Sequence, residues 1–153
     1  MSEVCIREYK VEDGDDVEEL FRFHTEKHLR KTTSFFYKKA LDGKPPDNVI
    51  AVVAVFKDRV IGFSGVQIVS STVTNHPVTI VHKDFRSRGI GKMLMRKKLE
   101  IAQKKGLREY NSIVGKENLT SRRMLEGLEN FAISDEGEYD KNKNWLKYRK
   151  KLD

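Results

Sequence analysis

The residues with the clearest chemical potential lie close together near the middle of the chain, in the segment R-S-R-G-I-G-K. Arg86, Arg88 and Lys92 supply positive charge there. Gly89 and Gly91 have no Cβ, so the backbone can approach a ligand closely. If a helix begins at this point, its first N–H groups lack partners and carry the positive end of the helix dipole. The pattern therefore predicts a site for a pyrophosphate group.

The segments on either side of this loop agree with that interpretation. A β-branched run, residues 78–81, precedes it, and a stretch with helical periodicity follows to about residue 105. Two other phosphate loops do not fit. Position 94 is Leu, which excludes the dinucleotide pattern G-x-G-x-x-G, and no G-K-[ST] is present for a nucleoside-triphosphate loop.

The R-x-x-G-x-G pattern from Arg86 to Gly91 resembles the acetyl-CoA-binding motif of the GNAT N-acetyltransferases. The resemblance implies that the pantetheine arm pairs with the strand before the loop and that the pyrophosphate lies on the loop amides. It also implies an oxyanion donor among the N–H groups of that strand, for which we name Ile80. The cofactor-binding residues expected on this basis are Thr79, Val81, Arg86, Ser87, Arg88, Gly89, Ile90, Gly91, Lys92, Asn118 and Ser121.

Asn118 and Ser121 have two interpretations. The N-x-x-S spacing resembles the second GNAT motif, in which the Asn contacts pantetheine. Asn is also a good helix N-cap, and Ser121 falls in the turn that such a cap would close. Both roles can hold together.

The acid and the base of the reaction are not evident in the sequence. A protonated amine with a pKa near 10 has no lone pair for attack on a thioester, so a base or a water chain must remove a proton. The Tyr common in the family seven residues after the Asn is Leu125 here, and residues 78–81 contain no carboxylate. Tyr139 is a candidate acid and His76 a candidate base, although each also suits a surface or loop position.

The amine acceptor is not specified either. In the family, the first two helices and their loop bound the acceptor pocket, which makes His28, Phe35 and Phe36 candidates for its wall. The alternatives are a partly buried helix face for the histidine and core packing for the aromatics. His24 and His28 lie one helical turn apart, but no further His or Cys cluster is nearby, so we expect no metal.

The elements around the motif predict an α/β (α+β) fold with a mixed, mostly antiparallel sheet flanked by helices. We expect a single domain over residues 1–153, with residues 71–77 as a polar connection and the last strand at an exposed edge. The order β-α-α-β-β-β-α-β-α-β-β matches the GNAT order, with an opening between the fourth and fifth strands. Predicted strands cover residues 4–9, 49–56, 60–70, 78–82, 109–114, 131–134 and 145–152; predicted helices begin at residues 15, 33, 90 and 118.

Composition leaves two classes of anion partner open. The net charge is +7 and the pI is near 9.4, which suits either a phosphorylated cofactor or nucleic acid. Much of the excess lies on the helix from Lys92 to Lys105, where a solvated face is the usual explanation. A non-catalytic acyl-CoA sensor or a basic nucleic-acid-binding module is the alternative to an enzyme, and the nucleic-acid version ranks last because no stacking aromatics accompany the lysines.

Location and partners follow from the remaining features. The longest apolar run, residues 49–56, is too short for a membrane helix, and no apolar leader is seen, so we expect a cytoplasmic protein. The single cysteine, Cys5, is expected as a small buried hydrophobe. The expected partners are acetyl-CoA and an amine, possible self-association as a homodimer, and no membrane. The sequence thus predicts an acetyl-CoA-dependent N-acetyltransferase acting by direct attack in a ternary complex.

Overall fold

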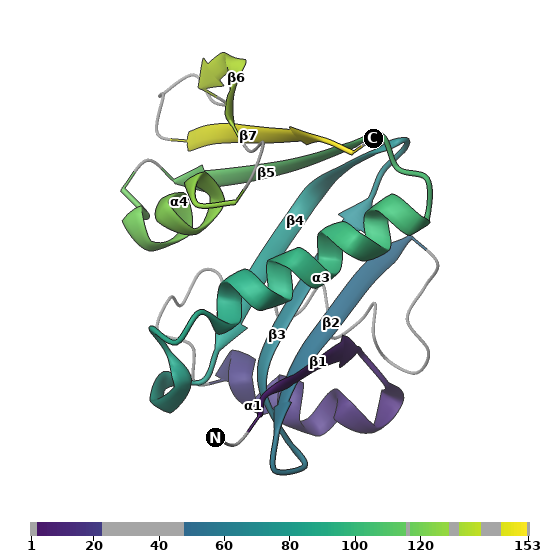
Figure 1. Ribbon diagram of the computed structural model, residues 1–153, viewed down its shortest axis with the longest axis vertical. Helices are drawn as coiled ribbons and strands as arrows, with labels where there is room; N and C mark the ends of the chain where they lie inside the picture. The colour runs from purple at the N-terminus through teal and green to yellow at the C-terminus, as the bar shows by residue number, and fades with distance from the viewer. Residues whose placement is uncertain (1–2, 23–47, 116, 129–131, 139–144, 153) are drawn as a thin grey trace.

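The computed structural model of the 153-residue chain describes residues 3–22, 48–115, 117–128, 132–138 and 145–152. Its described strands form one sheet in the order β1-β2-β3-β4-β5-β7-β6 (Figure 1). Neighbouring strands are antiparallel except β4 and β5, which are parallel. The predicted mixed α+β class is confirmed. The strands are β1 (Cys5–Glu8), β2 (Val49–Phe56), β3 (Arg59–Ile68), β4 (Thr72–Val81), β5 (Glu109–Gly115), β6 (Ala132–Glu138) and β7 (Trp145–Lys151).

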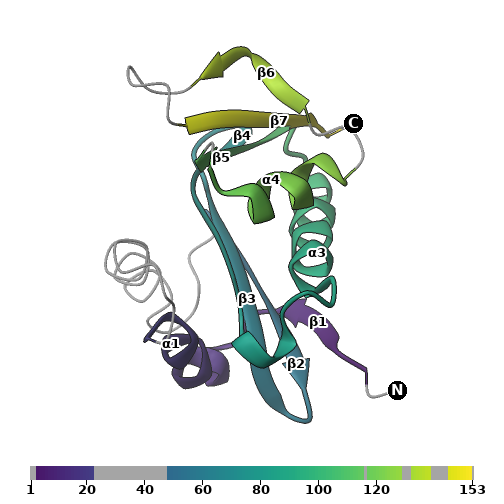
Figure 2. The ribbon, with the colours of Figure 1, turned by 90° about the vertical axis from the view of Figure 1, so that its left-hand side faces the viewer.

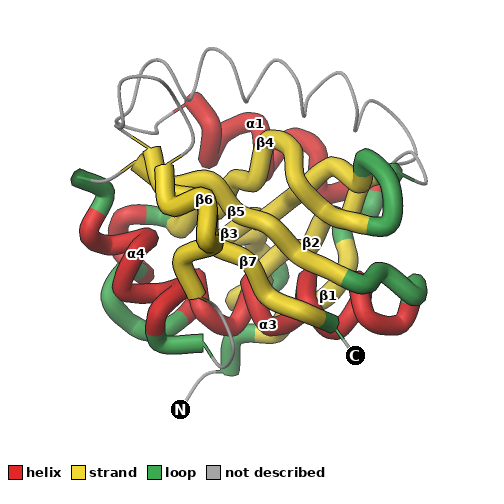
Figure 3. Tube along the Cα trace, turned by 90° about the horizontal axis from the view of Figure 1, so that it is seen from above, coloured by secondary structure: helices red, strands yellow, loops and turns green. Residues whose placement is uncertain are grey.

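Helices cover both faces of the sheet. On one face lies α1 (Gly14–Arg22), preceded by the short η1 (Val11–Asp13); on the other lie α3 (Ile90–Lys104) and α4 (Leu119–Glu126) (Figures 2 and 3). The turn η2 (Lys83–Phe85) joins β4 to α3. A helix predicted to begin at residue 33 lies outside the described residues.

The two faces of the sheet bury separate apolar clusters. In β2, Ile50 and Val52 pack in the α3 cluster, while Val49 and Ala51 pack in the α1 cluster. Strand residues alternate between faces, so a strand covered on both sides must be apolar at nearly every position. That requirement explains the continuous apolar run of residues 49–56.

Strand β4 differs from its prediction, because the expected polar connection at residues 71–77 is part of the strand. Its pairing with β3 contains irregularities: Gly65 pairs with Val78, Gln67 with Asn75 and Ile68 with Val73. Between the first two of these pairs, β3 advances by two residues and β4 by three. The extra residue makes β4 bulge at His76 and Pro77. Proline cannot donate a ladder hydrogen bond and is typical of bulges. Pairing with β3 therefore outweighs the polar composition of this segment.

Three further expectations were wrong. Strand β7 lies between β5 and β6, so its lysines do not mark a sheet edge. Cys5 is exposed, on β1, which forms one edge of the sheet with β6 at the other. Lys98 is completely buried although it belongs to the basic helix that we expected to be solvated.

Candidate functional site

The parallel strands β4 and β5 separate soon after they meet. They pair only at Thr72 with Glu109 and at Val73 with Tyr110. Beyond that point, β4 continues against β3 as far as Val81, whereas β5 pairs with β7. Figure 1 shows the two strands diverging, with α4 beside the gap. The edge of β4 that faces β5 thus has no strand partner over its last residues, within the part of the chain described.

The backbone groups that face this opening can be identified from the ladder. The His82 N–H donates to the Ile61 oxygen at 2.8 Å, in the same register as the rest of the β3–β4 pair. Donors alternate along an antiparallel strand, so Val78 and Ile80 also direct their N–H groups to β3. Thr79 and Val81 direct theirs away from β3. Our choice of the Ile80 N–H as a donor to a ligand is therefore wrong in this geometry, because that N–H faces the neighbouring strand.

The peptide group between Val78 and Thr79 is polarised by a hydrogen bond from the β3 side. The Ser64 hydroxyl is buried and donates to the Val78 oxygen at 3.0 Å, which uses its one hydrogen. The hydroxyl of Thr79, 2.7 Å from Ser64 Oγ, must then be the donor in that second bond. A hydrogen bond to a carbonyl strengthens the N–H of the same peptide as a donor. The Thr79 N–H, which faces the opening, is thus a strengthened hydrogen-bond donor.

The loop after β4 leads directly into the helix start. Ser87 and Gly89 have positive φ angles of 63° and 80°, a conformation that glycine adopts without strain. The first helical hydrogen bond runs from Met93 N–H to the Gly89 oxygen (3.0 Å), and no side chain caps the helix. The N–H groups at the start of α3, those of Ile90, Gly91 and Lys92, therefore precede the helical ladder, as the predicted anion site requires.

The three cationic side chains around this loop are held differently. Arg86 Nε donates to the Val81 oxygen at 3.0 Å, which ties the loop to the end of β4. The Arg88 guanidinium lies 5.4 Å from the centroid of the Phe85 ring, and both arginines are exposed. The Lys92 side chain reaches towards the last turn of α4, where a Cβ added to Gly127 would lie 3.1 Å from Lys92 Nζ. The arginines thus remain at the surface beside the helix start.

Helix α4 borders the opposite side of the opening. Asn118 caps it, because its Oδ1 accepts from the Ser121 N–H at 3.2 Å. At Gly91, an added Cβ would lie 3.3 Å from Met124 Sδ and 3.8 Å from Thr79 Cγ2, so the start of α3 is pressed between α4 and β4. The structure thereby shows the capping role predicted for Asn118, and it brings both sequence motifs to one opening.

The family model for the acetyltransferase (GNAT) family matches residues 14–128, more than half of the chain. The chain belongs to the GNAT acetyltransferase family. A comparison with curated protein sequences gives no significant match.

Solved GNAT structures share the whole fold at low sequence identity. A PaiA N-acetyltransferase from Thermoplasma acidophilum, in complex with coenzyme A, has a TM-score of 0.75 and 17% identity, covering 97% of this chain and 99% of its own. The ribosomal-protein-S18-alanine N-acetyltransferase from Escherichia coli has a TM-score of 0.71 and 12% identity, covering 98% and 94%. A phosphinothricin acetyltransferase from Sinorhizobium meliloti, in complex with acetyl-CoA, has a TM-score of 0.72 and 15% identity, covering 99% and 89%.

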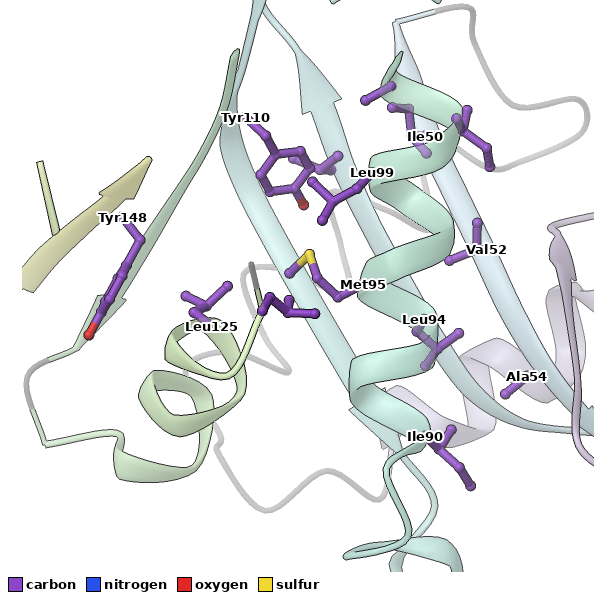
Figure 4. Close-up of a cluster of buried hydrophobic side chains, with 14 of the residues drawn as sticks. Ile50, Val52, Ala54, Ile90, Leu94, Met95, Leu99, Tyr110, Leu125 and Tyr148 are labelled. Carbon is purple, nitrogen blue, oxygen red and sulfur yellow. The ribbon is translucent and has the colours of Figure 1, made fainter. Parts of the chain in front are cut away.

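The position at which the resemblance implies an acid is apolar in this chain. Leu125, which replaces the family's Tyr, is 1% exposed and packs in the cluster that contains Tyr110 and Tyr148 (Figure 4). His76 lies in β4 at the bulge. Tyr139, His28, Phe35 and Phe36 lie outside the described residues, so their proposed roles stay predictions.

One buried group near the opening was not predicted. Lys98 lies four residues after Leu94 and three before Ile101, both of which are buried apolar residues of α3. That spacing places it on the buried face of the helix. The helical phase was thus a usable signal, but the abundance of neighbouring lysines concealed it.

Two kinds of feature are absent from the described residues. None of their helices is long and apolar enough to cross a bilayer. No group of three or more His, Cys, Asp and Glu side chains among them could hold a metal ion.

Proposed function

We propose that the protein is an N-acetyltransferase that moves the acetyl group of acetyl-CoA directly to an amine. The observation that carries this proposal is the opening between β4 and β5, which has the unpaired edge of Thr79–Val81 on one side and the uncapped start of α3 at its mouth. An extended amide arm followed by a pyrophosphate fits such a strand edge and helix start. Coenzyme complexes of similarly folded proteins support the same ligand.

Each part of the site has a stated task in this proposal. The N–H groups of Ile90, Gly91 and Lys92 would hold the pyrophosphate, with Arg86 and Arg88 beside it. The Thr79 C=O and the N–H and C=O groups of Val81 would pair with the pantetheine arm, and Asn118 and Ser121 would border it from α4.

We assign the oxyanion to the Thr79 N–H. When the amine nitrogen attacks the thioester carbon, negative charge develops on the carbonyl oxygen, and a fixed donor stabilises that charge. Thr79 is the first residue after the bulge that directs its N–H into the opening, and the Ser64 hydroxyl polarises its peptide group. Removing one such donor typically lowers kcat by about 10²- to 10³-fold in other enzymes.

The acceptor is proposed only as an amine. The similarly folded proteins named above include one that acts on a protein alanine and one that acts on phosphinothricin. At 12–17% identity these structures share the fold and not a substrate. His28, Phe35 and Phe36 remain proposed for the acceptor wall, His76 for the base and Tyr139 for the acid.

A thermal-shift titration with acetyl-CoA tests the coenzyme site. At a ligand concentration of about 100 Kd, binding adds roughly 2.7 kcal/mol, which corresponds to about 5–10 °C in Tm for a domain of this size. ADP, which lacks the pantetheine arm, should give a smaller shift. No shift with acetyl-CoA at saturating concentrations would contradict the proposed function.

The chain supplies a matched pair of variants for this titration. Gly89 and Gly106 both have a φ angle of 80°, and at both a Cβ would meet nothing within 4 Å. Gly89 precedes α3 and Gly106 follows it. Gly89→Glu and Gly106→Glu therefore carry similar left-handed strain, about 1–2 kcal/mol, and the same added charge. We expect only Gly89→Glu to lose the acetyl-CoA shift, because its carboxylate would repel the pyrophosphate; equal shifts in both variants would contradict the assigned anion site.

Turnover then identifies the acceptor class. A thiol-reactive dye reports free coenzyme A as it is released, and a panel of peptide N-termini, lysine peptides, polyamines and small amines can be compared. An amine-dependent rate well above the hydrolysis rate supports transferase activity. Coenzyme binding without any amine-dependent release would instead indicate a sensor.

A further inference from the structure

Lys98 has an unusual environment for a lysine. Its relative exposure is 0%, and its amine donates a long hydrogen bond of 3.5 Å to the Gly65 oxygen. The same amine lies 5.6 Å from the centroid of the Tyr110 ring. Its nearest polar partner is thus one neutral carbonyl, and an aromatic face completes the contact.

These contacts place the amine behind the point where the opening begins. Gly65 pairs with Val78, the residue that follows the β4 bulge. Tyr110 belongs to the last pair that joins β5 to β4. Lys98 therefore contacts β3 and β5, the strands on either side of β4, close to the place where β4 and β5 separate. The N–H of Thr79, assigned above to the thioester oxygen, belongs to the residue directly after Val78.

No acidic side chain among the described residues pairs with the Lys98 amine. Burial lowers the pKa of Lys98 to about 7, and burial raises the pKa of Tyr110, which keeps its phenol neutral. The cluster side chains from β1, β2 and α4 are apolar, and β7 contributes the phenol of Tyr148. Lys97, the neighbouring lysine on α3, pairs instead with Glu100 at 3.5 Å.

A lysine in this position lowers the stability of the folded protein, whereas an apolar residue of the same length would not. Among the described residues the other buried charged side chain is Asp13, and it is paired with Arg7 at 2.8 Å. Buried ionisable groups without a charge partner, at the edge of a cleft, are candidates for a role in function. In the proposed acetyl transfer, negative charge develops on the sulfur that leaves as a thiolate.

We propose that Lys98 supplies the positive charge against which the thiolate of coenzyme A departs. This inference rests on the proposed function. It explains how the site can work with Leu125 where the family has a Tyr, because a thiolate stabilised by a nearby ammonium needs no separate acid. Lys98 would act on the sulfur by its charge, from within the core behind the opening. It would not touch the coenzyme, so it is a positioning residue.

The proposed step forms one bond and breaks another. The amine nitrogen forms a bond to the carbonyl carbon, and the carbon–sulfur bond breaks with its electron pair on sulfur. The proton that the acceptor nitrogen loses passes to solvent or to a base, and the charge of the Lys98 ammonium behind the opening stabilises the thiolate until a solvent proton converts it to the thiol.

The thiol pKa of bound coenzyme A tests the proposal. Thiolate absorbs in the ultraviolet, so the absorbance of the complex with coenzyme A is followed against pH, and the complex with acetyl-CoA, which has no thiol, serves as the blank. Free thiols titrate near pH 8.5. The wild-type protein should lower the pKa of the bound thiol by about one unit, a tenfold change in its acidity, because a thiolate at this place and the protonated form of Lys98 favour each other. Lys98→Met should abolish that shift.

Lys97→Met is the matched control, because it removes the adjacent lysine from the exposed side of the same helix. It should titrate like wild type. Lys98→Met should also lower kcat about tenfold while the KM for acetyl-CoA stays within about twofold, because the binding groups are unchanged. If Lys98→Met does not fold, Lys98→Gln serves for the same titration.

The outcomes separate this inference from the proposed function. Binding of coenzyme A with the same thiol pKa in wild type and in the Lys98 variants would overturn the role of Lys98 alone. Failure of the wild-type protein to bind coenzyme A would overturn both. A lowered thiol pKa in wild type that Lys98→Met reverses and Lys97→Met leaves intact would establish it.

Discussion

The buried amine of Lys98 makes the stability of the protein rise with pH, in the same direction as a carboxylate whose pKa is lowered on folding but over a higher pH range. Its pKa is lowered by burial from 10.5 to about 7. Between those values the unfolded chain binds a proton that the folded chain does not, so the free energy of unfolding rises with pH. Above pH 10.5 the amine is neutral in both states and burying it carries no charge penalty. As the pH falls to about 7 this stability is progressively lost, because the unfolded chain gains the proton first.

The size of the effect follows from the same two pKa values. Each pKa unit corresponds to about 1.4 kcal/mol. Over the whole window the difference is on the order of 5 kcal/mol, and between pH 7 and pH 9 it is about 2 kcal/mol. Lys98→Met keeps a side chain of similar length but removes the titrating group, so this part of the pH dependence should disappear. The variant should also be more stable than wild type at pH 7.

Urea unfolding at pH 6, 7, 8 and 9 measures this directly. The quantity to compare is the difference in free energy of unfolding between wild type and each variant at each pH, which cancels the titration of the other groups. Lys97→Met, whose lost side chain is half-exposed, should give a nearly constant difference. If the Lys98→Met difference is equally constant, the amine is not a titrating group of the folded core and the reasoning fails.

Two other substitutions test separate parts of the structure. Asp13→Asn should lower the free energy of unfolding by about 1–3 kcal/mol at pH 7, because it breaks the ion pair with Arg7 and weakens the 2.7 Å hydrogen bond from the Lys10 N–H. Burial opposes ionisation of Asp13, but these hydrogen bonds outweigh it and lower its pKa, so its contribution is lost as the pH falls below about 4; acid unfolding that is the same in the variant would contradict this. Leu125→Tyr should cost about 1–3 kcal/mol through overpacking without raising kcat, since Lys98 already serves the thiolate; an increase in kcat would show that a missing acid limits turnover.

The sequence predicted the fold well where one local rule governed each element. Strand β2 matches the predicted range 49–56 because a strand buried on both faces has an unmistakable composition. The helix predicted after the glycine loop ends just before Gly106, whose positive φ is typical of a glycine that follows a helix. The loop motif and the element order also agreed with the family that the comparisons then showed.

Predictions failed where pairing or packing between distant segments decided the outcome. Residues 72–77 are polar enough for a connection, yet they join β4 because β3 offers them a partner. The direction of the Ile80 N–H depends on the register with β3, which no local pattern specifies. Lys98 was counted with the exposed lysines of its helix, and its burial depends on β3 and β5 packing against that helix face.

The sequence by itself therefore determined that the chain carries a strand, a glycine loop and a helix start suited to a pyrophosphate, since those features depend on neighbouring residues. The tertiary structure alone decided which backbone groups of Thr79 and Val81 face the opening, and which lysine lies behind it. The physical reason is that both facts are properties of register and packing between segments far apart in the chain. Local composition constrains such contacts only weakly.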